Sequence, residues 1–496
     1  MELIYINGQW IPSQSQQSRS IHNPATLETL STVPDCSAED VDGAVRAARQ
    51  AQRDWWKMPG LEKAALLREV GSRIRGMEHE LALLLTRESG KPLIESLDCV
   101  EWVAACFEYY AEVGRASRGN SIPPVAPHQL NFTIKEPYGV VAAIVPFNFP
   151  LLLMAWKVAP ALAAGNTLVC KPPHQNPLSN LLMAKAYDIL PPGVVNVITG
   201  DGSTGEALIQ HPDVDLIAFT GSTAVGRHIA SVAGQHLKKV NLELGGVDPF
   251  IVFEDADLEV AVRGVAWARL LNAGQVCTSS KRIYLVKSIA QEFCERLLEH
   301  VHSLKVGDPL LPETDIGPLI SADAVEKVEK QVWQACQEGA TLLRGGQRIP
   351  DWCGHFFEPT VLTNVRHGSL PTTEEIFGPV IALIEAEDAD QAIMMANDSR
   401  FGLGASVYTR SLEYALKAME NIKAGTFWVN DPLTDNDAAP FGGMRWSGNG
   451  RELGEEGLDA FREPKHVHID YIMERKNYWY PYRDRPWPDG IHLDDL

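Results

Sequence analysis

The chain alternates between helical and strand-like hydrophobic patterns. Apolar residues recur at helical spacing in three early segments, 39–56, 61–88 and 96–115. Short β-rich runs follow at 139–146, 167–172, 194–199 and 216–221. Each of the last three runs leads into another helical pattern. This alternation is typical of βαβ units and predicts a parallel sheet with helices on both faces.

A second alternating series extends from 247 to about 440. Its expected strands are "PFIVF", "RIYLV", "PVIALIEA", "GASVYTR" and "GTFWVN". The segment 117–139 interrupts the alternation with Pro-rich turns around one alternating strand, which favours an arm that reaches a neighbour. The tail 471–496 is dense in Tyr, Trp and Pro, so we expect it to pack on a surface of its own subunit or of a partner, where it could cover a substrate entrance.

Composition narrows the classes of function. A length of 496 residues suggests about three domains, and the net charge of −20 argues against nucleic acid or an anionic membrane as a partner. The longest weakly charged stretch contains Pro146, Asn148, Pro150 and Lys157, which argues against a membrane span. The first residues, "MELIYINGQW", show no secretory signal pattern.

The eight cysteines include no CxxC pair, and the histidines are scattered. This usage predicts reduced thiols, a cytoplasmic protein and no metal site.

Two glycine patterns follow predicted strands and open predicted helices. "GDGSTG" (200–205) fits the GxGxxG pattern, and "GSTAVG" (221–226) could present backbone N–H groups to a phosphate. A Rossmann fingerprint requires an acid about 20 residues after the first pattern. Thr220, Gly221 and Ser222 stand there instead. These loops alone leave nucleotide binding open.

Cys277, in "NAGQVCTSS", has no acid, base or second sulfur beside it, and an isolated thiol of this kind is more often a buried hydrophobe than a nucleophile. Other short segments change that interpretation: "PFNFP" with Asn148, "KPPH" with Lys171, "LELGG" with Glu243, "EEIFGP" (374–379) and "PFGGMRWSGNGRELG" (440–454). With these segments in this order, and Glu243 34 residues before Cys277, the chain resembles the NAD(P)-dependent aldehyde dehydrogenase superfamily over nearly its whole length. "EWVAACFEYYAEVG" and "LLLMAWKVAPALAAGN" look most like the betaine- and aminoaldehyde-oxidising branch.

The resemblance implies an α/β fold with three parts. These are a Rossmann-type NAD(P)-binding domain over 1–118 and 139–245, an α/β catalytic domain over 246–445, and a small β oligomerisation arm with the C-terminal tail over 119–138 and 464–496. It also implies a homodimer or a homotetramer.

The resemblance assigns catalytic roles to Cys277, Asn148, Glu243 and Glu452. The Cys277 thiolate would add to an aldehyde, and the Asn148 amide with the Cys277 N–H would stabilise the oxyanion. Loss of hydride to the nicotinamide would leave a thioester, which water activated by Glu243 would hydrolyse. Glu452 would assist proton relay or form a structural ion pair; both remain open. Taken singly, Glu243 could be a strand-end charge and Asn148 a turn former.

By the same resemblance, nine residues would bind NAD or NADP: Lys171, His174, Gly205, Gly221, Ser222, Gly226, Leu244, Glu375 and Phe377. Lys171 would hold the adenosine ribose and Glu375 the nicotinamide ribose. Many NAD-preferring members carry an acid where this chain has His174. An imidazole there removes repulsion against a 2′-phosphate, so we hypothesise that NADP⁺ is accepted.

The expected substrate funnel is lined by Phe149, Trp156 and Phe441, with Leu271, Val276, Thr278 and Asp435 nearer the thiol or in the loop "DPLTDNDAAPFGG". Small residues such as Gly274 would leave room for the cofactor ring. The acids slightly favour a cationic aldehyde or aminoaldehyde over semialdehydes and over aliphatic or aromatic aldehydes.

Two other functions stay open: a CoA-acylating semialdehyde dehydrogenase, against which Glu243 argues, and a non-catalytic protein that retains the fold.

Overall fold

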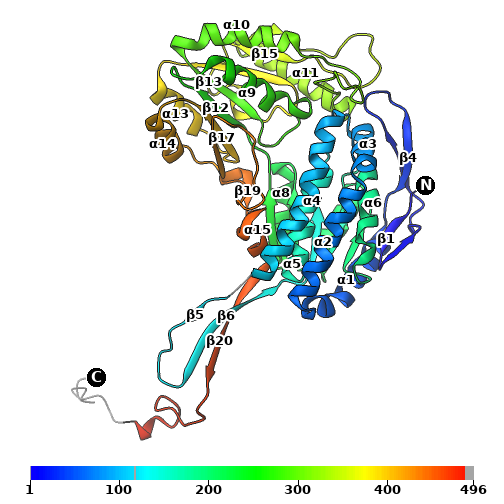
Figure 1. The fold of residues 1–496 in the computed structure, drawn as a ribbon, viewed down its shortest axis with the longest axis vertical. Coiled ribbons are helices and arrows are strands. Elements are labelled where there is room, and N and C mark those ends of the chain that lie inside the picture. Colours follow the sequence, from blue (N-terminus) through cyan, green and yellow to red (C-terminus); the bar gives the residue numbers. More distant parts are fainter. Residues whose placement is uncertain (1, 117–118, 486–496) are drawn as a thin grey trace, which may run out of the picture. The chain divides into compact units, whose positions relative to one another are not determined.

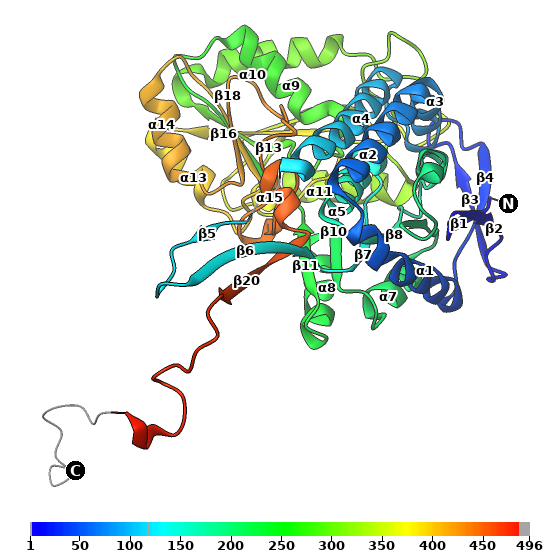
Figure 2. The ribbon, with the colours of Figure 1, turned by 60° about the horizontal axis from the view of Figure 1, so that its bottom comes forward.

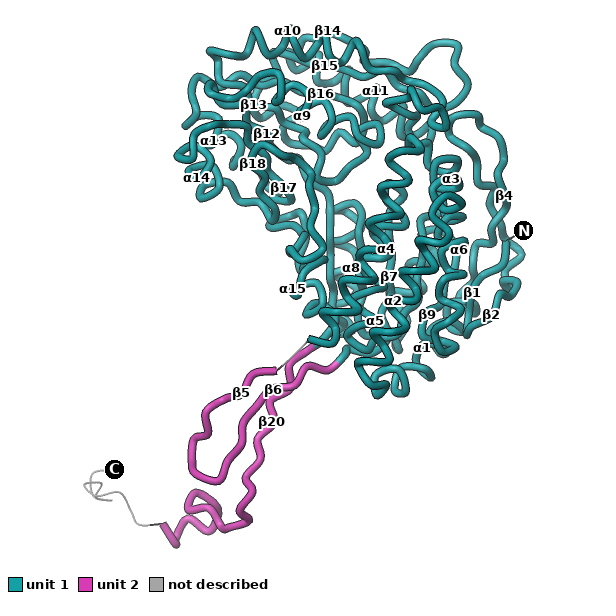
Figure 3. Tube along the Cα trace, in the orientation of Figure 1, with its two compact units in different colours: residues 1–116, 137–462 teal, residues 117–136, 463–496 magenta. Residues whose placement is uncertain are grey.

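The computed structural model describes residues 2–116 and 119–485, and the chain falls into two compact units (Figure 3). Unit 1 comprises residues 1–116 and 137–462, and unit 2 comprises residues 117–136 and 463–496. Unit 1 holds two large sheets, and the strands of each are mostly parallel. The predicted α/β class is therefore confirmed. The domain boundaries predicted inside unit 1 stay a prediction.

The first sheet has the strand order β19-β11-β10-β7-β8-β9-β1-β2. Its parallel strands are β7 (Val140–Ile144), β8 (Thr167–Lys171), β9 (Val195–Val197), β10 (Leu216–Thr220) and β11 (Lys239–Glu243). The antiparallel edges are β1 (Ile4–Ile6), β2 (Gln9–Ile11) and β19 (Gly448–Asn449). The four strands predicted between 139 and 221 are all present. β1, β2, β11 and the hairpin β3 (Ser18–His22) with β4 (Thr29–Pro34) were not predicted.

The strands of this sheet are buried on both sides because helices cover both of its faces. Along β7, Val141 and Ala143 face one hydrophobic cluster, and their neighbours along the strand face another. The first cluster packs under α2 (Gly60–Gly76), α4 (Leu93–Ala116) and α5 (Pro150–Ala164). The second packs under α1 (Ala38–Lys57), α7 (Gly202–Gln210) and α8 (Thr223–Gln235), which lie on the opposite face (Figure 2).

The long helix predicted over 61–88 is in fact two helices, α2 and α3 (Glu78–Ser89). Met77 lies between them with φ −107° and ψ 9°, outside the helical region. Gly76 precedes Met77, and glycine is a poor helix former, so the chain breaks its helix there although the apolar spacing continues. The expectations for 39–56 and 96–115 are confirmed by α1 and α4.

The second sheet has the order β14-β15-β16-β13-β12-β17-β18. Its strands are β12 (Asp248–Val252), β13 (Ser280–Val286), β14 (Thr341–Arg344), β15 (Thr360–Thr363), β16 (Val380–Ala386), β17 (Gly404–Tyr408) and β18 (Thr426–Val429). All pairs are parallel except β14 with β15. All five strands predicted for this half are present. Its covering helices include α9 (Leu258–Leu270), α10 (Lys287–Ser303), α11 (Ala322–Gln337) and α13 (Ala389–Asn397), and α14 (Leu412–Asn421) follows β17 (Figure 1).

Strand register aligns the strand ends of the first sheet, and a short link leads from them to the second sheet. In the first sheet Thr220 lies opposite Glu243, and Ile144 lies opposite Lys171, so these strands end together at one carboxyl edge. β11 ends at Glu243 and β12 begins at Asp248, so the short segment 244–247 leads from that edge to the second sheet. Ligands of open α/β sheets bind outside the carboxyl ends of the strands, so this junction is where a site is expected.

Unit 2 is a three-stranded sheet of order β20-β6-β5. Its strands are β5 (Ser121–Ile122), β6 (Gln129–Pro137) and β20 (Arg462–Asp470), so the predicted arm contains two strands rather than one. Beyond β20, Tyr478, Trp479 and Tyr480 are exposed. The rest of the predicted surface-packing tail, 486–496, lies outside the described residues. None of the helices within 2–116 and 119–485 is long and apolar enough to span a membrane.

Asn166 links three segments of unit 1. Its Oδ1 accepts from the Gly139 N–H (2.9 Å), and its Nδ2 donates to the carbonyls of Phe461 (2.8 Å) and Ala161 (3.2 Å). Replacement by alanine leaves these buried backbone groups without hydrogen-bond partners. Asn166→Ala should therefore lower the free energy of unfolding by about 3 kcal/mol and the thermal midpoint by several degrees. Asn421→Ala, at an exposed asparagine, is the matched control and should shift stability by less than about 0.5 kcal/mol. Equal midpoints for both variants would contradict this role.

Candidate active site

Cys277 lies in the turn between α9 and β13. Asn272 and Ala273, just before it, have left-handed backbones (φ 49° and 54°). Gly274 follows with φ +75°, and a Cβ there would lie 2.2 Å from the Gly378 carbonyl oxygen. The expectation that Gly274 leaves room for a cofactor ring is therefore wrong. It is glycine because the backbone is left-handed and passes directly against another chain segment.

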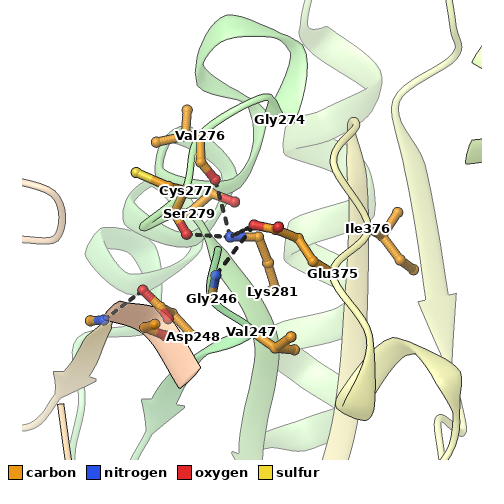
Figure 4. A network of polar contacts seen from close by, with 12 residues as sticks. Gly246, Val247, Asp248, Gly274, Val276, Cys277, Ser279, Lys281, Glu375 and Ile376 are labelled. Carbon is orange, nitrogen blue, oxygen red and sulfur yellow. Dashed lines mark hydrogen bonds and ion pairs between the residues drawn. The ribbon is translucent and has the colours of Figure 1, made fainter. Parts of the chain in front are cut away.

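A buried lysine holds the backbone of this turn (Figure 4). Lys281 Nζ donates to the carbonyls of Val276 (3.1 Å) and Cys277 (2.5 Å) and forms an ion pair with Glu375 Oε1 (3.1 Å). The Cys277 sulfur points away from this lysine. Glu375, predicted to bind the nicotinamide ribose, is thus engaged by Lys281, and its binding role stays a prediction. Sequence reasoning missed Lys281, although its spacing of four residues from Cys277 was visible.

Arg269 supplies a second clamp that the sequence did not reveal. It is 1% exposed and donates to the carbonyls of Gly274 (3.1 Å), Ile376 (2.7 Å) and Val380 (2.6 Å). These bonds tie the Cys277 turn to the segment that carries Glu375 and Phe377. The Phe377 ring meets the Phe147 ring edge-on at 5.9 Å between centroids.

Glu243, the last residue of β11, is buried beside Cys277. Burial raises the pKa of its carboxyl well above the ordinary range, Glu452 adds to the rise, and Lys157 opposes it. Burial likewise raises the pKa of the Cys277 thiol, and the negative charge of Glu243 reinforces this. Neither carboxyl oxygen of Glu243 accepts a conventional hydrogen bond from the described residues. The charge of Glu243 therefore disfavours the Cys277 thiolate, whereas the contact with Cys277 lowers the pKa of Glu243.

Glu452 forms a fully buried ion pair with Lys157 of α5. The Nζ–Oε1 distance is 2.5 Å, and the two side chains are 1% and 0% exposed. Lys157 Nζ also donates to Thr220 Oγ1 (2.6 Å), and Thr220 is the register neighbour of Glu243. The structural ion pair anticipated for Glu452 is present, and its relay role stays a prediction. Lys157 was missed: the only signal was a lysine inside an otherwise apolar helix.

Asn148 lies in the turn between β7 and α5 and is 3% exposed. Its carbonyl accepts from Asn272 Nδ2 (3.2 Å), and the Asn272 N–H donates to Glu95 Oε2 (3.0 Å). Glu95 of α4 therefore anchors the left-handed turn, which contacts the Asn148 backbone and leads on to Cys277. Burial raises the pKa of Glu95 to about 7. Neither Glu95 nor Asn272 was singled out from the sequence.

A cavity of about 680 Å³ opens onto Cys277. It brings together all the predicted substrate residues: Phe149, Trp156, Leu271, Val276, Thr278, Asp435 and Phe441. The rings of Trp156 and Phe441 pack with centroids 4.9 Å apart. Its lining also includes residues that sequence reasoning missed, among them Glu95, Asp98, Trp102 and Trp267.

Except for Glu375 and Phe377, the predicted cofactor residues follow strands of the first sheet at its carboxyl edge. Lys171 ends β8, and a Cβ on Gly205 would lie 3.7 Å from its Cε; burial lowers the pKa of Lys171 to about 8. Ser222 is the N-cap of α8, whose first turn offers backbone N–H groups. Gly226 lets α8 approach Leu244, since a Cβ there would meet Leu244 Cδ2 at 2.3 Å.

Gly221 links two of these segments, because its N–H donates to the Glu243 carbonyl (3.0 Å). A helix N-terminus beside a buried lysine suits a dinucleotide that bears phosphates and ribose hydroxyls.

His174, close to Lys171, is exposed. Partial removal of its ring from water and the charges of Arg19 and Lys171 lower its pKa. Arg19 reaches this corner from β3, held by Asp35 (2.6 and 2.8 Å) and by Asp201 (3.5 Å). Arg19 is a cation near the predicted adenosine end that the sequence analysis did not consider.

Two parallel sheets with a cysteine, a buried carboxyl and a helix N-terminus at their common edge define a two-sheet α/β oxidoreductase of the dinucleotide-binding type. The sequence pattern of the aldehyde dehydrogenase family matches residues 10–467. The chain belongs to the aldehyde dehydrogenase family, which confirms the resemblance and makes the protein an oxidoreductase that acts on aldehydes.

The chain is 41% identical to betaine aldehyde dehydrogenase 1 of Oryza sativa subsp. japonica over 96% of this chain and 97% of that protein. It is 39% identical to the betaine aldehyde dehydrogenase of Bacillus subtilis (strain 168), over 94% and 97%. Among solved structures, the betaine aldehyde dehydrogenase of Staphylococcus aureus in complex with NAD⁺ superposes with a TM-score of 0.94 at 36% identity, over 97% and 96% of the two chains. An E. coli structure described as an NADP dependent enzyme gives 0.92 at 38%, over 94% and 98%.

Lys157 lowers the pKa of Glu243, so its removal has a signed effect on pH dependence. In Lys157→Met the pKa of Glu243 should rise further. A general base works only when deprotonated, so the acidic limb of kcat for thioester hydrolysis should move to higher pH. We expect the single-turnover release of reduced cofactor to shift less than steady-state kcat. The measurement is a pH–rate profile of both phases.

Lys185→Met removes an exposed lysine and serves as the control. Because an unpaired Glu452 is destabilising, circular dichroism should accompany the kinetics. An acidic limb of kcat that stays in place in folded Lys157→Met would contradict the coupling.

Proposed function

We propose that the protein oxidises an aldehyde to its carboxylic acid with NAD⁺ or NADP⁺ through a covalent intermediate on Cys277. The observation that carries this is the placement of Cys277 at a 680 Å³ cavity, beside the buried carboxyl of Glu243. Burial raises the pKa of both groups, so the thiol and the carboxyl are each harder to ionise than in water.

The Cys277 sulfur adds to the carbonyl carbon and gives a thiohemiacetal, whose oxygen is stabilised by the Asn148 side-chain amide and the Cys277 N–H. The Glu95–Asn272–Asn148 contacts hold these donors in place. Bound NAD(P)⁺ supplies the hydride acceptor, held by the Lys171 and Ser222 edge. Transfer of a hydride to that cofactor, with release of the hydroxyl proton to solvent, would leave a thioester on Cys277.

Glu243 then takes one proton from water, and the water oxygen attacks the thioester carbonyl, so that the product leaves as a carboxylate and the second water proton goes to the Cys277 sulfur. The proton on Glu243 must then leave, and Glu452, held by Lys157, is its proposed acceptor. A buried base fits water as the acyl acceptor, whereas CoA would bring its own acidic thiol. This supports hydrolysis over the CoA-acylating alternative, and the complete residue set supports catalysis over a non-catalytic role.

A cationic aldehyde or an aminoaldehyde is the proposed substrate class. Asp98 and Asp435 line the cavity without an ion pair to any described residue, beside the Trp102 and Trp156 indoles. Carboxylates and indole faces both attract ammonium groups. The names of the rice and Bacillus relatives point the same way.

NADP⁺ is proposed as an accepted cofactor alongside NAD⁺. Arg19, Lys171 and His174 gather at one corner, which would favour a 2′-phosphate. The proposed assembly is a homodimer or homotetramer built through the unit 2 sheet, whose strands leave Leu130 and Ile134 exposed. The proposed location is the cytoplasm, in line with eight unpaired cysteines.

Glu243→Gln should separate the two half-reactions. The amide cannot activate water, so we expect one rapid turnover of reduced cofactor per active site, followed by a steady rate about a hundredfold or more lower. Stopped-flow absorbance with an aldehyde panel, with and without CoA, measures both phases. Glu254→Gln, at a carboxylate in a loop outside the cavity, is the control. Loss of the first turnover while Cys277 can still be alkylated would overturn this assignment.

His174→Glu should change cofactor preference. A carboxylate repels a 2′-phosphate, so kcat/KM with NADP⁺ should fall about tenfold or more relative to NAD⁺. His236→Glu, at an exposed histidine, should keep the parent ratio. A parent enzyme that prefers NAD⁺ a hundredfold would contradict NADP⁺ acceptance.

A further inference from the structure

Lys281 of β13 lies four residues after Cys277 and places one buried cation between two parts of the site. Its Nζ donates to the carbonyls of Val276 (3.1 Å) and Cys277 (2.5 Å), and its third contact is the ion pair with Glu375 Oε1 (3.1 Å). An ammonium group has three N–H donors, so these three oxygens occupy all of them. The side chain is only 2% exposed. The same charge therefore acts on the Cys277 turn and on Glu375 (Figure 4).

The contact with Val276 sets the direction of the Cys277 N–H. The Val276 carbonyl and the Cys277 N–H belong to one trans peptide group, which is planar, so the two bonds point in opposite directions. Because the Val276 oxygen faces Lys281, the Cys277 N–H faces away from it. The Cys277 sulfur also points away from Lys281. The lysine thus holds the N–H on the side of the thiol, where an oxyanion would form.

Glu375 is the part of this cluster that another ligand can reach. Its side chain is 24% exposed, and its Oε2 lies against the link between the two sheets, since a Cβ on Gly245 would be 2.4 Å from it. A carboxylate that is already paired with an ammonium group is a weaker acceptor for a hydroxyl group, because part of its charge is neutralised. Lys281 therefore competes for Glu375 with the ribose hydroxyls of a cofactor.

Charged groups from several elements act on the Cys277 thiol. Burial and the charge of Glu243 in β11 raise its pKa, Lys281 lowers it, and Glu375 and Asp248 raise it further. Burial also raises the pKa of Asp248 in β12 to about 7, and Lys281 opposes that rise. Lys281 thus favours the thiolate, whereas the carboxylate of Glu375 disfavours it.

We propose that Lys281 is a positioning residue with opposite effects on two sites: it orients the Cys277 N–H and favours the thiolate, and it weakens cofactor binding by holding Glu375. This inference rests on the proposed function, in which the Cys277 N–H stabilises the oxyanion and Glu375 contacts the cofactor. Loss of the ammonium group should therefore make the thiol less reactive and the cofactor more tightly bound in the same protein. A lysine that only supported the fold would weaken both.

The first test is Lys281→Met, which removes the charge and keeps a side chain of similar length. Alkylation of Cys277 by iodoacetamide without cofactor should shift to higher pH and slow about fivefold at pH 8. Calorimetry should give dissociation constants for NAD⁺ and NADP⁺ that are lower by about threefold. The first turnover of reduced cofactor should slow by more than alkylation does, because only aldehyde addition needs the Cys277 N–H.

The second test, Glu375→Gln, does not depend on the folding of the lysine variant. The amide has nearly the shape of the carboxylate but no charge, so alkylation without cofactor should become about fivefold faster at pH 8. Cofactor binding should weaken. Alkylation at the parent rate in Glu375→Gln would overturn the proposal, and so would a folded Lys281→Met that binds the cofactor no more tightly than the parent. Equal slowing of alkylation and of the first turnover in Lys281→Met would overturn the orienting role.

The matched control is an exposed ion pair where β13 meets α10. Lys287 and Glu387 lie 2.9 Å apart, and their side chains are 56% and 64% exposed. Lys287→Met and Glu387→Gln should leave the alkylation rate and the cofactor dissociation constants at their parent values. Circular dichroism of all four variants shows whether each is folded.

Alkylation and cofactor binding need no aldehyde, so they separate this proposal from the proposed function. The expected opposite shifts in a protein that oxidises no aldehyde would defeat the proposed oxidation alone. Aldehyde oxidation by the parent, without those shifts in the variants, would defeat the proposal for Lys281 alone.

Discussion

The site depends on one constraint: strand register places the carboxyl edge of one sheet against the amino ends of another. Thr220 and Glu243 end neighbouring strands in register, and only residues 244–247 lead from Glu243 to β12. The Cys277 turn enters β13 at the same junction. Parallel strands align their ends because each crossover returns the chain in the same direction. A base at the end of a strand and a thiol in a turn, distant in sequence, therefore meet.

Burial gives that meeting its chemistry. Lys157 and Glu452 are removed from water together, and each is stable there only because of the other. Glu243 forms no ion pair with the residues that the structure describes, and burial raises the pKa of its carboxyl beside the Cys277 thiol. Lys281 and Arg269 use their charge to hold backbone carbonyls of the turn. At this junction, the ion pair of Lys157 with Glu452 and the cations Lys281 and Arg269 fix the geometry. Glu243 and Cys277 are the groups that can exchange protons.

Much of the fold was visible in the sequence because its central strands are buried on both faces. β8, β9 and β10 read as short apolar runs followed by helical patterns, and the structure has them where the runs lie. The break at Met77 was missed because apolar spacing continues across it. β11 was missed because three of its five residues, Lys239, Asn241 and Glu243, are polar. Such a strand carries a weaker hydrophobic signal than the apolar runs of β8 and β10.

The sequence alone determined the family, the identity of Cys277, Glu243 and Asn148 as candidates, and the residues around the thiol, because each lies in a short segment of recognisable composition. Only the tertiary structure decided which polar residues support them. Lys157, Glu95 and Lys281 have no distinctive neighbours, and each is defined by a partner that folding brings to it. Local pattern encodes local conformation, whereas burial and charge pairing exist only after distant segments pack.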